Sequence, residues 1–550
     1  MKRLKLFCEK LSLFSCRFVR LLALGLTGFL FLGAFFFTCY SENMETQQVL
    51  TKWDNPLSSL LGLAVLSATV LGVLGAIRLL QRLFPALRAG RLLPFLVMAW
   101  CLFVGAALIL FGRTVPAADS MSVYSAAEAL AGGDTSVIHP TDSYLSYYPQ
   151  QIGLVAFYEL LIRFWKLLPF SLPAYHFIKC VNVLFSCVIL LFQYKTVHLL
   201  WQNERTDCIY LTLAGGFLPF LMYPSFVYGE IPSFAAASIG FYCLGRLFWS
   251  LTSDATAKNK APGIQKPLLY LFSATVFLTL AVMLRKNSLI FIIAAVLAAF
   301  FQWLRERKHL LLVFALVCTI CSLSILPLVQ KTYEIRAHST LKSGVPAISY
   351  LAMGMQESSR GNGWYNGFNF NTYQSTGMDT EETAALSRAA IGERLQYFRE
   401  NPKAFAAFYA GKLLSQWADG TYACRQATLA TFGGRSSFFD SLYAGDASSY
   451  VIDYCNAFQN LFYLGAFLFF VWDIRKNRRK ENSPLGLFLY LGIIAVMGGF
   501  LFHIAWEANS RYIFLYAMLL LPYGARGLYL SGRYISGRVP RSAKGNGLGL

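Results

Sequence analysis

Apolar runs of roughly 20 residues recur along the chain, from Leu21–Tyr40 near the start to Tyr512–Leu530 near the end. A helix of this length crosses the hydrocarbon core of a bilayer. Only 14% of the 550 residues are charged, whereas a soluble domain carries about 25%. The sequence therefore predicts an all-α integral membrane protein in contact with a lipid bilayer.

About twelve transmembrane helices are predicted from the lengths of the runs and the charges between them. They cover Leu21–Tyr40, Leu57–Leu80, Leu92–Phe111, Tyr175–Leu200, Cys208–Tyr228, Pro232–Leu251, Leu268–Leu284, Ser288–Leu304, Leu310–Val329, Val451–Trp472, Leu485–Ala505 and Tyr512–Leu530.

The basic residues between the runs orient these helices. Cytoplasmic segments carry an excess of Lys and Arg. With twelve helices, every basic cluster falls on the same side as the basic N-terminus: Arg78–Arg91, Lys258–Lys266, Arg305–Lys308, Arg475–Lys480 and Arg533–Lys544. Both termini are thus expected to be cytoplasmic. This bias accounts for the formal charge of +20, and no nucleic-acid-binding pattern accompanies it, so nucleic acid is not expected as a partner.

Two long segments, 112–174 and 330–450, then lie on the outer side. Segments of this length are usually functional when they are ordered. Each contains helix-like stretches expected at the membrane interface: SMSVYSAAEALAGG and YLSYYPQQIGLVAFYELLIRFWKLL in the first, and Glu381–Arg399 and Ala404–Trp417 in the second. The stretch YLSYYPQQIGLVAFYELLIRFWKLL is interpreted as either interfacial or re-entrant. The predicted division is a two-helix membrane extension (1–90), a transmembrane core containing the first outer segment (91–329), a large outer segment (330–450), and C-terminal helices with a basic tail (451–550).

Two carboxylates near the outer ends of the runs are candidate catalytic residues. Asp119 follows the third run and precedes an apolar-periodic helix, so it is either the N-cap of that helix or a functional group at the membrane surface. Glu230 lies between two runs, where an ionisable residue is a functional candidate by default. The alternative is a hydrated residue in a tight turn.

Candidate phosphate-binding residues also lie at the outer ends. Arg285 and Lys286 violate the positive-inside bias in a short outer connection. They either bind a lipid-borne phosphate or extend towards lipid head groups. Glu507 and Arg511 are spaced i, i+4, so one helix face could hold them as an ion pair, or both could belong to the site.

Aromatic and amide side chains in the outer segments are candidate substrate contacts. Such rings stack on sugars and amides bond their hydroxyls, but aromatic residues are equally expected at a membrane interface. The candidates are Tyr147, Tyr148, Gln150, Trp364, Trp417 and Asp419. Cys424 and Cys455 could form an outer disulfide or remain free.

The arrangement resembles the GT-C fold of membrane glycosyltransferases, the broad group that includes protein mannosyltransferases and the aminoarabinose transferases of lipid A. The resemblance extends from about Arg91 to Leu530. It is carried by PAADSMSVYSAAEALAGGD, YLSYYPQQIGLVAFYELL, VYGEIPS, LRKNSLI and WEANSRYIF. Asp119 is followed by Ser120 and not by the Glu of protein mannosyltransferases, which puts a protein acceptor in doubt.

The resemblance implies an inverting transfer of sugar from a polyprenyl-phosphate donor to an extracytoplasmic cell-envelope glycan, glycolipid or polymer. Asp119 would be the general base, and Arg285, Lys286 and Arg511 would bind the donor phosphate. No cofactor or metal ligand set is predicted, although a divalent metal stays open. The alternatives are a multi-pass transporter or flippase, and a polymerase or ligase of lipid-linked glycans.

Overall fold

In a computed structural model, residues 2–41, 46–84, 89–141, 143–253, 265–475 and 485–537 are described. The chain is almost entirely helical, and eleven helices in these ranges are long and apolar enough to cross a membrane. They are α1 (Lys2–Phe36), α2 (Pro56–Leu83), α3 (Ala89–Gly112), α7 (Ala174–Trp201), α10 (Glu230–Ser253), α11 (Gln265–Leu284), α12 (Leu289–Glu306, preceded by η3, Lys286–Ser288), α13 (His309–Ala337), α20 (Ser448–Arg475), α21 (Leu491–Ala505, preceded by η4, Gly486–Tyr490) and α22 (Ser510–Ile535).

The run predicted as one straight helix at 208–228 is instead broken. The helices α8 (Glu204–Gly216), α9 (Leu218–Met222) and η2 (Tyr223–Ser225) pass the same test together, but with a bend of 61°. Pro219 is the second residue of α9 and donates no backbone hydrogen bond, and Gly215 and Gly216 end α8. Counting this pair as one span gives twelve, as predicted.

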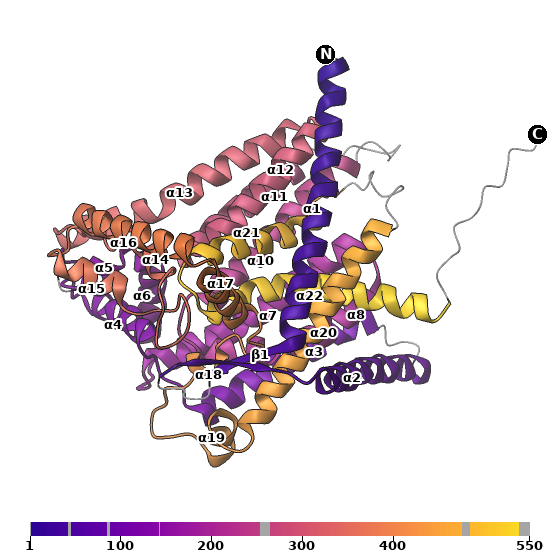
Figure 1. The fold of residues 1–550 in the computed structure, drawn as a ribbon, viewed down its shortest axis with the longest axis horizontal. Helices are drawn as coiled ribbons and strands as arrows, with labels where there is room; N and C mark the ends of the chain where they lie inside the picture. The colour runs from indigo at the N-terminus through magenta and orange to yellow at the C-terminus, as the bar shows by residue number, and fades with distance from the viewer. Residues whose placement is uncertain are drawn as a thin grey trace, which may run out of the picture.

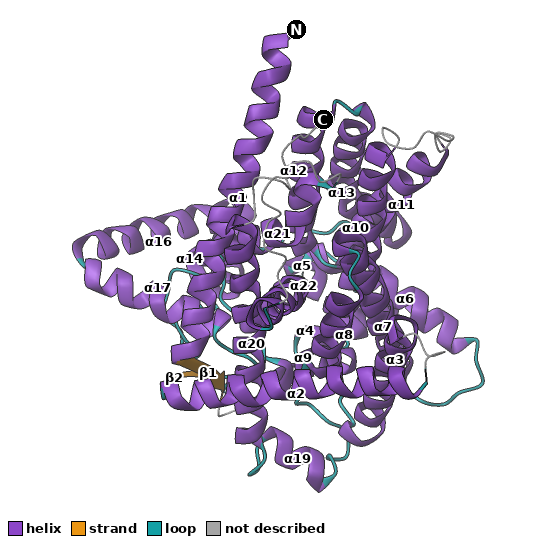
Figure 2. Ribbon diagram, turned by 90° about the vertical axis from the view of Figure 1, so that its right-hand side faces the viewer, coloured by secondary structure: helices purple, strands orange, loops and turns teal. Residues whose placement is uncertain are grey.

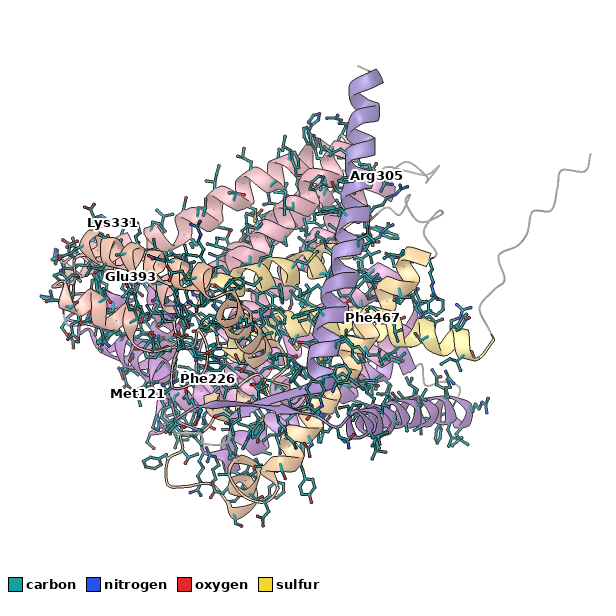
Figure 3. The ribbon with its side chains drawn as sticks, in the orientation of Figure 1. Met121, Phe226, Arg305, Lys331, Glu393 and Phe467 are labelled. Carbon is teal, nitrogen blue, oxygen red and sulfur yellow. The ribbon has the colours of Figure 1, made fainter. Side chains whose placement is uncertain are left out.

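The main-chain bonds of the connections show that the two long segments share one end of the bundle. Thr114 pairs with Thr431 in a β-bridge, and the amide of Val345 donates to the carbonyl of Tyr147 at 3.0 Å. Much of the two long segments lies at the left of Figure 1, whereas α2 and the end of α22 extend to the right. Met121, in the first long segment, lies at the left of Figure 3, and Arg305, near the end of α12, lies well away from it.

The helices predicted within the long segments are confirmed. The first segment contains α4 (Asp119–Gly132), α5 (Tyr144–Tyr147), η1 (Pro149–Gln151) and α6 (Ile152–Lys166). The second contains α14 (Ala347–Met353), α15 (Phe368–Ser375), α16 (Thr380–Glu400), α17 (Pro402–Trp417), α18 (Cys424–Ala427) and α19 (Ser437–Tyr443). Pro402 begins α17, and α16 and α17 form a projecting hairpin in Figure 2. Cys424 and Cys455 are buried free thiols.

One element was not expected from the sequence. The last residues of the first predicted span form strand β1 (Phe37–Ser41), which pairs antiparallel with β2 (Val49–Trp53). The amide of Cys39 in β1 also donates to the carbonyl of Ala418 at 3.0 Å. The N-terminal helices are therefore joined to the second long segment through this strand pair.

Helix α1 is also held within the bundle by charge. It packs against α20 and α12, and Arg20 lies 3.3 Å from the carboxylate of Asp473 and donates to the hydroxyl of Tyr490 at 2.7 Å. The basic segments at 85–88, 254–264, 476–484 and 538–550, on which part of the predicted orientation depends, lie outside the described residues.

Candidate active site

A buried cluster of charges lies where three helix connections meet. Glu230, the first residue of α10, is 1% exposed. It forms an ion pair with Arg285, which follows α11, and lies 3.6 Å from Arg511 near the start of α22. Gly229 allows this approach, because a Cβ there would lie 2.7 Å from the carbonyl oxygen of Leu284.

Aromatic rings surround the cluster. The guanidinium of Arg511 lies 5.4 Å from the ring centres of both Tyr228 and Tyr512, and that of Arg285 lies 5.8 Å from Tyr512. Two positive charges thus face one negative charge. One terminal nitrogen of Arg285 and the Nε of Arg511 are buried and face the same carboxylate oxygen of Glu230. The cluster therefore has one excess positive charge, and the remaining N–H groups of the two guanidinium groups are the donors that could bind an anion.

Glu507 lies beside this cluster, in the connection between α21 and α22, and is 8% exposed. Burial, reinforced by the charge of Asp119, raises the pKa of Glu507 to about 7, although Arg511 opposes the rise. The predicted helical ion pair between Glu507 and Arg511 is wrong. Asn509 caps α22 by accepting from the amide of Arg511, so Glu507 lies outside the helix, and the ion pair of Arg511 is with Glu230.

Asp119 is the first residue of α4, and its side chain is exposed. The N-cap alternative is wrong, because Ala118 occupies that position with a φ of 47°. Instead, the hydroxyl of Ser120 accepts from the amide of Ala117 at 2.9 Å. Within the described residues, the carboxylate of Asp119 makes no hydrogen bond or ion pair, yet its charge helps to raise the pKa of Glu507, Tyr148 and Tyr365. Asp119 is therefore a free carboxylate within electrostatic reach of the cluster.

The other end of α4 is held by a second buried carboxylate. Glu159 of α6 accepts from Arg163 at 2.8 Å and from Arg336 of α13 at 2.6 Å. Both arginines also donate to the carbonyl of Leu130, near the end of α4. Burial alone would raise the pKa of Glu159, but hydrogen bonds from Tyr333 and both arginines hold it below its ordinary value. These bonds fix α4, and with it Asp119, against α6 and α13.

Tyrosine side chains line the space near Asp119. Burial raises the pKa of Tyr148, Tyr228 and Tyr350, and in each case the charge of Asp119 adds to the rise. The hydroxyl of Tyr228 accepts from Gln151 at 2.6 Å. Tyr350 stacks on Trp506 with ring centres 5.1 Å apart. Of these residues only Tyr148 was predicted as a contact, although Tyr228 and Trp506 belong to the motifs VYGEIPS and WEANSRYIF.

The structure corrects several predicted substrate contacts. Trp364 is 4% exposed and donates to the hydroxyl of Ser415, and Trp417 is 2% exposed and packs against Phe500. Buried rings of this kind are not surfaces on which a sugar stacks. Asp419 is also buried, and its carboxylate accepts from Ser510 at 2.6 Å and from both polar groups of Thr421, so it joins the second long segment to α22.

The remaining predicted residues do not form one site. Tyr147 is buried in a small core with Tyr373 and Val345, while Gln150 is half-buried and its side chain makes no hydrogen bond to a described residue. Lys286 is exposed although Arg285 beside it is buried in the charge cluster. Arg285 and Lys286 therefore do not bind one anion together, because Arg285 is paired with the carboxylate of Glu230 and Lys286 lies on the surface.

The loop at 358–367 completes the site through Arg360, whereas the sequence pointed to Trp364 in the same loop. The guanidinium of Arg360 lies 5.6 Å from the ring centre of Tyr365. Its positive charge partly offsets the rise in the pKa of Glu507. The signal in the sequence is that three glycines, Gly361, Gly363 and Gly367, follow Arg360 closely. In the structure all three have a positive φ. No group of three or more His, Cys, Asp or Glu side chains in the described ranges could hold a metal ion.

No curated protein matches the chain. Among solved structures, the chain is similar to the archaeal oligosaccharyltransferase AglB from Archaeoglobus fulgidus, determined in complex with an inhibitory peptide and a dolichol-phosphate, with a TM-score of 0.42 and 12% sequence identity. The similarity covers 83% of this chain and 53% of AglB, so the chain spans about half the length of that protein. The model of one protein family, described as "Conserved hypothetical integral membrane protein", matches residues 16–525, and the chain belongs to this family.

Proposed function

We propose that the protein is a membrane glycosyltransferase that moves a sugar from a polyprenyl-phosphate donor to an extracytoplasmic cell-envelope glycan, glycolipid or polymer. One observation supports this most strongly: the free carboxylate of Asp119 lies within electrostatic reach of a buried cluster that carries one excess positive charge. A base next to an anion site is what transfer from a lipid phosphate requires.

The proposed reaction is a single displacement. The acceptor hydroxyl gives its proton to Asp119 while its oxygen attacks the anomeric carbon. The bond between that carbon and the phosphate oxygen breaks, and the electron pair leaves with the lipid phosphate. Arg511 and Arg285 stabilise the charge that develops on this phosphate. Transfer inverts the anomeric configuration because attack and departure occur on opposite faces.

The direct test supplies purified protein in lipid nanodiscs with a panel of polyprenyl-phosphate sugars and an envelope extract as acceptor. We expect release of free polyprenyl phosphate together with a glycosylated product. Movement of an intact lipid-linked sugar across a vesicle membrane without its cleavage would instead identify a flippase. Growth of a glycan on the lipid itself would identify a polymerase.

The proposal also requires the site to face outward, which labelling can test. Arg388 is exposed on α16, at the site end of the bundle, and Lys308 is exposed between α12 and α13. In a chain whose own cysteines are replaced, Arg388→Cys is expected to react with a membrane-impermeant maleimide added to intact cells. Lys308→Cys is expected to react only after permeabilisation. The reverse pattern would place the site in the cytoplasm.

A further inference from the structure

The loop at 358–367 is held rigidly at the site by three neighbouring segments. The carbonyl of Arg360 accepts from the amide of Val49 in β2 at 2.8 Å. The carbonyl of Gly363 accepts from the amide of Ala508 at 2.7 Å, next to Glu507. The side chain of Asn362 donates to the carbonyl of Phe408 in α17 at 3.2 Å. A loop fixed in this way presents its side chains in a defined geometry.

The side chain of Arg360 takes no part in this anchoring. It is half-buried and stacked on Tyr365, and it forms no ion pair with any carboxylate in the described ranges. The hydroxyl of Ser358 accepts from the amide of Arg360 and donates to the carbonyl of Tyr365, which keeps the two residues together. Arg360 therefore presents an oriented guanidinium whose hydrogen-bond donors are available to a ligand.

Asp119 is close enough to both this loop and the charge cluster for its charge to act on each. It acts on Tyr228 and Arg511 at the cluster and on Tyr365 in the loop. Under the proposed function, the acceptor hydroxyl must reach Asp119 while the donor phosphate occupies the cluster. The acceptor then extends from Asp119 towards Tyr365 and Arg360.

We propose that Arg360, stacked on Tyr365, binds an anionic group of the acceptor, a phosphate or a carboxylate. This rests on the proposed function, because it uses the positions of donor and acceptor given there. A planar guanidinium binds such an oxyanion through paired N–H groups, and the tyrosine beneath it leaves those groups at the edge of the plane free. The acceptor chemistry is thus that of an anionic envelope polymer or glycolipid.

The test compares two probes that differ only in charge, methyl glucoside and methyl glucoside 6-phosphate, by calorimetric titration of the full chain in nanodiscs. We expect the phosphate to bind at least tenfold more tightly. Arg360→Gln should abolish that preference, and Arg360→Lys should restore part of it because it keeps the charge and loses the fork. Arg388→Gln is the control, since Arg388 is exposed on α16 and forms no hydrogen bond or ion pair with a described residue. The loop anchors involve other atoms, so these variants are expected to fold.

Binding of geranylgeranyl phosphate and diphosphate separates the two proposals. Arg360→Gln should bind both prenyl probes as the native chain does. If the variant keeps the preference for the sugar phosphate, or if the native chain has none, the inference is wrong. A loss of affinity for either prenyl probe in this variant would assign Arg360 to the donor and would also overturn it. Failure of the native chain to bind either prenyl probe would count against the proposed function itself.

Discussion

Replacing Asp119 with asparagine is expected to lower the rate of sugar transfer by roughly a hundredfold or more, the usual scale for a missing general base. Asparagine keeps the shape of the side chain but cannot accept a proton. The carboxylate makes no hydrogen bond or ion pair with a described residue, so its loss should leave both stability and donor affinity unchanged. The measurement is release of polyprenyl phosphate under saturating donor.

Two further carboxylates serve as comparisons for Asp119→Asn. Asp134 is exposed just beyond the other end of α4 and bonds locally with Ser136, so Asp134→Asn should keep the native rate. Glu230→Gln removes the one negative charge from a buried cluster, and loss of one partner from a buried ion pair costs about 3–5 kcal/mol. Glu230→Gln should therefore lower the thermal stability of the protein as well as the rate of sugar transfer. If Asp119→Asn keeps its rate in a working assay, the acid–base mechanism is wrong.

The second large effect concerns the donor. Arg511→Gln removes the excess charge and leaves Arg285 and Glu230 as a neutral pair. A hydrogen bond to a charged group contributes about 1.5–3 kcal/mol, so we expect the affinity for geranylgeranyl phosphate to fall by roughly tenfold to a hundredfold. Equilibrium binding in nanodiscs measures this directly.

A double variant distinguishes excess charge from the presence of any particular arginine. Glu230→Gln with Arg285→Gln removes one charge of each sign and leaves Arg511 as the excess cation. Its donor affinity should fall by less than that of Arg511→Gln, because it keeps the excess positive charge although it loses the N–H groups of Arg285. Lys286→Gln is a surface control, because that side chain is exposed. If the double variant loses as much affinity as Arg511→Gln, the charge balance of the cluster is not what binds the donor.

The long helices were predictable because the membrane requires them. An apolar run of about 20 residues must satisfy its own backbone hydrogen bonds in lipid, so a helix is the available structure. The same reasoning misread Phe37–Tyr40, whose apolar residues form a strand and not the end of the first helix. It also missed the bend at Pro219, since hydrophobicity counts do not register a break between two short helices.

The site was predictable in part, for a physical reason. Asp119, Glu230, Arg285 and Arg511 stand out because charges at the ends of membrane helices are costly and rare. Which of them pair cannot be read from spacing, since Glu230 and Arg511 are far apart in the chain. In the long segments 112–174 and 330–450 a charged residue does not stand out in this way. An aromatic residue there is equally plausible on the surface and inside a packed core. Trp364 was therefore mistaken for a binding surface, and Arg360 was overlooked.

The strand pair has a consequence for how the protein is made. Strand β2 leaves the ribosome early, but the carbonyl of Arg360 with which Val49 bonds, and the carbonyl of Ala418 that receives the amide of Cys39, are synthesised several hundred residues later. At roughly 5–20 residues per second, that interval is on the order of tens of seconds. During this interval, the outer edges of β1 and β2 lack the partners that Ala418 and Arg360 later provide. The end of the bundle that carries the strand pair is consequently completed late, by segments from distant parts of the chain, and an insertion factor or chaperone has that period in which to engage the open strand.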